Sequence, residues 1–124
     1  AASDVYKRQI LDFLKAYDKE RDRNILSLAE KLIDILGKYS MNSTILTINR
    51  FQIIARKREL ELEERKILAQ IKYSENIFER CCACILLKQF DEFDIHIQQL
   101  SAIEKEEFYS WPIASLLPNV EKNE

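Results

Sequence analysis

The stretch from residue 78 to residue 113 constrains the fold of this chain more than any other. It reads FERCCACILLKQFDEFDIHIQQLSAIEKEEFYSWPI. Its first part, Cys81 to Leu87, is apolar on almost every side, a pattern typical of a buried helix. A short polar break precedes a second, amphipathic run from Phe90 to Leu100. We therefore expect these two segments to form a helical hairpin.

A third helix and a lid are predicted at the end of this stretch. Ser101 and Glu104 form the S-x-x-E pattern of a capping box, which fixes where a helix begins. Pro112 should end that helix, because a residue before proline is kept out of helical geometry. Four apolar side chains are expected to cover the open end of the hairpin, namely Phe108, Tyr109, Trp111 and Ile113.

Glycine and proline are scarce, with one and two among 124 residues, and this favours an all-α fold over strands joined by turns. Apolar residues recur at helical spacing in Ile10–Tyr17 and in Ile25–Leu36. The polar string 18–24 between them is expected to be an exposed loop. Gly37 stands where a glycine commonly ends a helix.

The segment from Thr44 to Tyr73 contains no helix breaker and is compatible with one long helix. Ser43 or Thr44 can cap its start. We prefer two helices separated by a break near Glu59–Glu61. Acidic residues follow that break, and they suit the positive N-terminal end of a new helix.

The two ends of the chain are set apart from the expected domain. Residues 1–9, AASDVYKRQ, resemble a translated sequencing adapter and are excluded from the fold prediction. A single helical-repeat domain is expected over residues 10–117, as the C-terminal part of a longer protein. Residues 118–124 are predicted to be a polar tail.

The segment LLKQFDEFDIHIQQL, Leu86 to Leu100, resembles the inter-helix turn and second helix of a tetratricopeptide-like repeat. Phe90, Asp91 and Glu92 follow the order of aromatic and acidic residues in that family. The Gly-Asp of the family's turn is missing, and Phe93 replaces a small alanine. The resemblance implies antiparallel hairpins stacked as a short α-solenoid that binds protein partners. A compact helical bundle is the alternative.

The chain's three cysteines, Cys81, Cys82 and Cys84, lie together in the apolar run. With one histidine, His96, and no second cysteine pair, we predict core packing and no metal site or other cofactor. His96 is expected to be exposed and no catalytic residue is predicted, so the chain is not expected to be an enzyme. Unpaired cysteines favour the cytoplasm, and no run approaches the length needed to cross a membrane.

The predicted function is non-catalytic protein–protein interaction, with a protein partner or an upstream domain. The candidate partner-binding residues are Asn49, Gln52 and Arg56, which recur along one helix face beside the core. The same stripe could instead brace a neighbouring helix. The basic surface Arg50–Arg58 gives an alternative function, a nucleic-acid-associated domain. A solvated face is the favoured interpretation of those charges, because the cluster is small and lacks interleaved aromatic residues.

Overall fold

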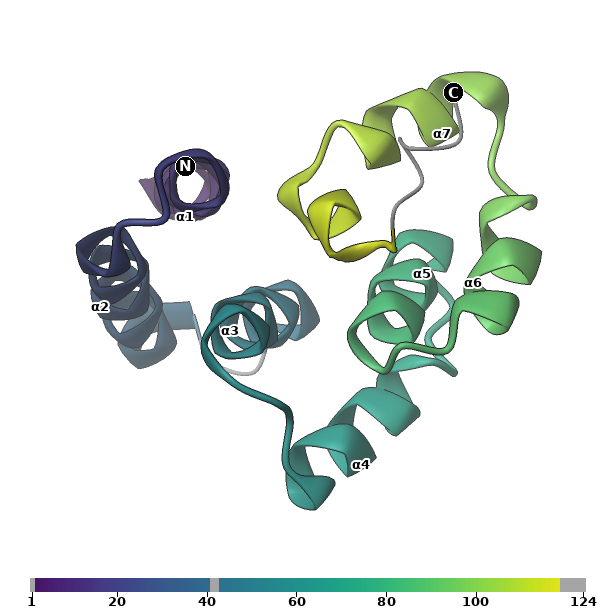
Figure 1. Ribbon diagram of the computed structural model, residues 1–124, viewed down its shortest axis with the longest axis horizontal. Helices are drawn as coiled ribbons and strands as arrows, with labels where there is room; N and C mark the ends of the chain where they lie inside the picture. The colour runs from purple at the N-terminus through teal and green to yellow at the C-terminus, as the bar shows by residue number, and fades with distance from the viewer. Residues whose placement is uncertain (1, 41–42, 119–124) are drawn as a thin grey trace. The chain divides into compact units, whose positions relative to one another are not determined.

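The computed structural model describes residues 2–40 and 43–118 (Figure 1). These residues form seven α-helices and one 3₁₀ helix, and they contain no β-strand. The predicted all-α class is therefore confirmed. The chain divides into two compact units, named unit 1 (Ala1–Glu59) and unit 2 (Leu60–Glu124). Within the described ranges, no helix is both long enough and apolar enough to span a bilayer.

Unit 1 contains helices α1 (Ala2–Glu20), α2 (Arg23–Ser40) and α3 (Thr44–Lys57). α1 and α2 pack against each other as a hairpin, and α3 packs against both. Ser43 begins α3 as predicted, because its Oγ accepts a hydrogen bond from the Leu46 N–H at 3.3 Å. All three helices supply the core, which consists of Ile10, Leu14, Tyr17, Leu26, Ala29, Ile33, Leu36, Leu46 and Ile53.

The turn between α1 and α2 is shorter than the polar string 18–24 predicted. Only Arg21 and Asp22 lie between the two helices. Arg21 adopts a left-handed conformation with φ 59°, and its N–H donates to the Tyr17 carbonyl at 2.6 Å. Asp22 Oδ1 then accepts from the Asn24 N–H at 2.9 Å and starts α2. Local capping therefore closes the turn, and the remaining polar residues stay helical.

Gly37 does not end α2, which continues to Ser40, so the predicted C-cap is wrong. A Cβ built on Gly37 would lie 3.8 Å from Arg50 Nη2, an ordinary van der Waals distance. A helical glycine costs about 1 kcal/mol relative to alanine. Ile33 and Leu36 in the turn before Gly37 lie in the core, and the helix continues beyond them for one further turn.

Unit 2 contains α4 (Leu62–Ile71), α5 (Ile77–Leu86), α6 (Phe90–Ile97), α7 (Ala102–Tyr109) and the 3₁₀ helix η1 (Pro112–Leu116). The predicted break near Glu59–Glu61 is confirmed, since α3 ends at Lys57 and α4 begins at Leu62. Glu61 and Glu64 form a capping box, in which the Glu61 N–H donates to Glu64 Oε1 at 2.7 Å. The acidic residues after the break thus start the new helix.

The hairpin of α5 and α6 lies at the centre of unit 2. Every residue from Cys81 to Leu87 is buried, as the apolar run predicts. Lys88 ends α5 in a left-handed conformation with φ 62°, and the Gln89 N–H donates to the Cys84 carbonyl at 2.9 Å. A lysine therefore occupies the position that glycine favours at the end of a helix.

An aromatic lid closes this hairpin. The predicted capping box is present, because the Ser101 N–H donates to Glu104 Oε1 at 2.8 Å and starts α7. Phe108 is fully buried, with its ring centroid 5.9 Å from that of Phe93 on α6. Trp111 lies 5.3 Å from Phe78 on α5. The predicted polar tail lies outside the described residues except for Pro118.

Candidate functional site

The predicted partner-binding stripe on α3 is engaged within unit 1. Arg56 Nε donates to Asp18 Oδ1 at 2.7 Å, and its Nη2 donates to Asp18 Oδ2 at 2.9 Å. This two-bond pairing is the strongest geometry between an arginine and a carboxylate. The Arg56 side chain is only 2% exposed and that of Asp18 is 23% exposed. The pair joins α3 to the end of α1.

The other two members of the stripe are held by the same helix. Arg56 Nη1 donates to the Gln52 carbonyl at 2.9 Å, and Gln52 Nε2 donates to Asn49 Oδ1 at 3.0 Å. These two bonds stay within α3, and the Arg56–Asp18 pair alone links α3 to α1, as the second interpretation of the pattern expects. Partner binding by Asn49, Gln52 and Arg56 stays a prediction.

The basic residues proposed to contact nucleic acid also have acidic partners in unit 1. Arg50 pairs with Asp34 at 3.3 Å, and Lys57 pairs with Glu30 at 2.7 Å. With Arg56 on Asp18, three cations of the Arg50–Arg58 surface are thus balanced by carboxylates from α1 and α2. A phosphate backbone would have to displace these carboxylates, which weakens the case for a nucleic-acid interface.

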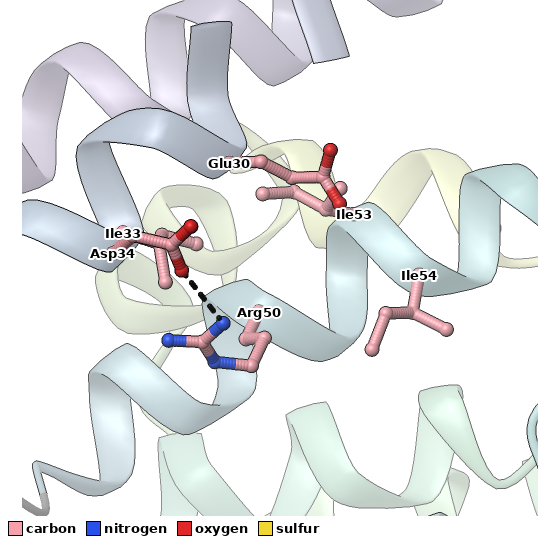
Figure 2. Close-up of a pocket in the computed structure, with 6 residues that line it drawn as sticks. All are labelled: Glu30, Ile33, Asp34, Arg50, Ile53 and Ile54. Atoms are coloured by element: carbon pink, nitrogen blue, oxygen red, sulfur yellow. Dashed lines mark hydrogen bonds and ion pairs between the residues drawn. The ribbon is translucent and has the colours of Figure 1, made fainter. Parts of the chain in front are cut away.

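A small pocket lies where α2 faces α3 (Figure 2). Its volume is about 230 Å³, below the range typical of sites for small-molecule ligands. Figure 2 shows the ion pair between Asp34 and Arg50 in its wall. Its lining residues are Glu30, Ile33, Asp34, Arg50, Ile53 and Ile54. Because its charged groups pair with one another or with Lys57, we interpret the pocket as a packing defect between two helices.

α2 carries apolar residues on a second face, beside its buried stripe. Ile25, Leu28, Leu32 and Ile35 follow each other at spacings of three, four and three residues. This is the a/d pattern of a heptad repeat, and we name these four residues the α2 seam. Ile25 and Leu32 are half-buried against the core, whereas Leu28 and Ile35 are each 46% exposed.

The positions beside the α2 seam are basic on one side. Lys31 and Lys38 take the g position of the heptad, and both are exposed. The opposite e position is taken by Ala29 and Leu36, which belong to the core. The seam is therefore a strip of apolar side chains bordered by the core on one edge and by two lysines on the other. Sequence reasoning missed it, since the alternation of two apolar faces was read as one wide buried stripe.

The three cysteines of unit 2 are buried and none forms a disulfide. Burial, with a smaller contribution from nearby Cys84, raises the pKa of the Cys81 thiol to about 12. Burial is also the main cause that raises the pKa of Cys84 to about 11, with Glu92 adding to it. Burial raises the pKa of Cys82 as well. These thiols are protonated at neutral pH and are poor nucleophiles.

His96 is not the exposed residue that its neighbours Ile95 and Ile97 suggested. It is half-buried, and its Nδ1 is buried without a hydrogen-bond partner among the described residues. The packing of α6 on α5 brings His96 close to Cys84 and to Glu92. Sequence reasoning considered Cys84 with His96 but missed Glu92. The signal that could have found it is the spacing of four residues between Glu92 and His96, which places both on one face of α6.

Comparison with known proteins found no matching family model, curated protein or solved structure. The resemblance of Leu86–Leu100 to a tetratricopeptide-like repeat therefore stays a prediction.

Proposed function

We propose that this chain is a non-catalytic interaction module, and that the α2 seam binds an amphipathic helix of a protein partner. The observation that carries the proposal is the heptad spacing of four apolar residues, of which Leu28 and Ile35 are exposed and Ile25 and Leu32 half-buried, on a helix whose neighbouring face is already buried. Single exposed apolar residues are ordinary on protein surfaces. Four at a/d spacing along one helix face are the pattern that a second helix recognises.

The charges beside the α2 seam indicate what kind of helix would bind. A partner helix with its own a/d residues on the seam would bring its flanking positions next to Lys31 and Lys38. Glutamate or aspartate at those positions gains from the pairing, and lysine or arginine is repelled. A second copy of α2 would place lysines near lysines if antiparallel, and if parallel it would offer Lys31 and Lys38 only Ala29 and Leu36, which are already in the core. We therefore infer an acidic amphipathic helix as the occupant.

The structural context that we propose is a short helical array of the tetratricopeptide-like type, in the cytoplasm. The hairpin of α5 and α6, with Phe90, Asp91 and Glu92 at the start of α6, supports a repeat unit. The aromatic lid supports its position at the end of an array, because terminal repeats need a covered face. Three unpaired cysteines support a reducing compartment.

The test uses a synthetic acidic peptide of about three heptads, with leucine at a and d and glutamate at e and g. Its glutamates repel one another, so it remains a monomer until it meets a basic partner. We expect the full chain to bind it, as measured by fluorescence anisotropy. A Leu28→Glu/Ile35→Glu double variant should bind at least roughly tenfold more weakly, since two half-exposed apolar side chains no longer contact the peptide.

Two controls make this experiment specific. A peptide with lysine in place of each glutamate should bind more weakly than the acidic one, because it faces Lys31 and Lys38. A Leu62→Glu variant changes an equally apolar residue, 67% exposed, that is not part of the α2 seam, and it should bind normally. Equal binding of both peptides, or equal loss in Leu62→Glu, would reject the proposal.

A further inference from the structure

The hairpin of α5 and α6 brings three metal-ligating side chains together. Cys84 comes from α5, while Glu92 and His96 lie one turn apart on α6. One ligand atom from each residue lies within 4.8 Å of the other two. Cys84 is buried, His96 is half-buried and Glu92 is exposed, so the cluster extends from the core to the surface. An ion could therefore reach it from solvent.

The donor atoms are one sulfur, one imidazole nitrogen and one carboxylate oxygen. Zn²⁺ accepts all three types, at bond lengths of about 2.0 to 2.3 Å. Bonds of that length place tetrahedral ligands roughly 3.5 Å apart, so the atoms would each move inward by about 1 Å or less. The exposed Glu92 side chain can supply much of this motion by changing rotamer. Three protein ligands would leave the fourth position to water.

A second observation points to a missing ligand at this place. The buried His96 Nδ1 has no hydrogen-bond partner among the described residues. Buried polar atoms are nearly always paired, and an unpaired one calls for an explanation such as an ion or water. Among the described residues, none holds the imidazole ring through Nδ1, so this atom is available to an ion.

We propose that Cys84, Glu92 and His96 bind one zinc ion, which links α5 to α6. As the Zn–S bond forms, the Cys84 thiol releases its proton to solvent. The resulting thiolate and the Glu92 carboxylate together balance the two positive charges of the ion. The site is independent of the α2 seam, because all three residues belong to unit 2.

Lys72 lies next to the proposed zinc site and should affect its affinity. Its Nζ donates to Glu92 Oε1 at 2.8 Å, and it also donates to Gln89 Oε1. The ammonium group is therefore paired with the carboxylate that zinc would use, and the positive charge of Lys72 repels the ion. When zinc binds, Lys72 gives up Glu92 and keeps Gln89. Lys72 is expected to weaken zinc binding.

The test measures zinc binding by the full, reduced chain in competition with a chromogenic chelator. We expect one zinc per chain. Cys84→Ala and His96→Gln should each weaken zinc binding by roughly tenfold or more. Mutating even a residue that only hydrogen-bonds to a metal ligand lowers metal affinity by roughly tenfold or more. Cys82→Ala is the matched control, since it removes a buried thiol from the same helix outside the cluster, and its affinity should change less than about twofold.

The surface variants keep the proposal testable even if Cys84→Ala does not fold. Glu92→Gln should weaken zinc binding, whereas Lys72→Gln should strengthen it severalfold. Lys105→Gln, which makes the same charge change on α7, should have little effect. An absence of zinc binding by the native chain, or unchanged affinity in both Glu92→Gln and Lys72→Gln, would overturn the proposal.

His96 provides a direct spectroscopic readout, because it is the one histidine of the chain. Its ring signals in an NMR spectrum are therefore assigned without ambiguity. One equivalent of zinc should shift them, and the shift should be lost in Cys84→Ala. Ring signals that stay in place when zinc is added would also overturn the proposal.

Discussion

Removing Arg56 should be among the most damaging single changes in unit 1. The Arg56→Ala variant loses two hydrogen bonds to Asp18 and one to the Gln52 carbonyl. Breaking a fully buried ion pair by removing one partner costs about 3 to 5 kcal/mol. Because Asp18 is 23% exposed and can be partly hydrated once alone, we expect about 2 to 3 kcal/mol of lost stability.

The assay is urea denaturation of the full chain, followed by the helical circular dichroism signal. Arg50→Ala is the matched control. It also removes an arginine of α3 paired with an aspartate, but that pair is exposed, at 46% and 68%. Exposed pairs contribute about 0 to 1 kcal/mol, so the control should lose no more than that.

A double-mutant cycle then separates the pair from the rest of the Arg56 side chain. Asp18→Ala and Arg56→Ala should each destabilise the fold, and the double variant should lose clearly less than the sum, by about 1 to 3 kcal/mol. If the two losses simply add, or if Arg56→Ala costs no more than Arg50→Ala, the idea that Arg56 braces α1 against α3 is refuted. Partner binding would then be the favoured role of the Arg56 side chain.

Two further outcomes are expected. Lys88→Gly should stabilise the chain by up to about 1 kcal/mol in urea denaturation, because glycine adopts the left-handed conformation at φ 62° without strain. Gln89→Gly, the control at the next residue, should not stabilise it. Alkaline pH should destabilise the chain above pH 9, because the thiols ionise there in the unfolded chain. In the folded chain, burial holds the pKa of Cys84 at about 11 and that of Cys81 at about 12, and it also raises the pKa of Cys82. The stabilising effect of the buried thiols is fully present below pH 9, and Cys82→Ala removes one of them, so its urea midpoints should fall less steeply from pH 8 upward. Urea midpoints that stay constant up to pH 10 would contradict this.

The local features of the fold could be predicted from the sequence because their signals are local. Ser43 caps α3, and the pair of Ser101 and Glu104 caps α7. The break before Glu61 follows from acidic residues and a change of apolar phase. The aromatic lid follows from a proline and a cluster of large side chains. Each of these depends on contacts within a few residues or on simple exclusion of water.

The features that sequence reasoning missed depend on residues distant in the chain. Arg21 and Asp22 close the turn after α1 locally, but nothing near Asp18 in the sequence shows that this residue binds Arg56, 38 residues away. Gly37 looked like a helix end, but α2 continues past it to Ser40. Glu92 was overlooked because a search for cysteine and histidine pairs does not include a carboxylate on the neighbouring helix.

The central claim is that the α2 seam binds an acidic amphipathic helix, and an NMR titration tests it most directly. Methyl signals of the full chain would be followed while the acidic heptad peptide is added. We predict that the largest shifts occur at Ile25, Leu28, Leu32 and Ile35. Shifts centred instead on the α3 residues around Asn49 and Gln52, or no shifts at all, would contradict it.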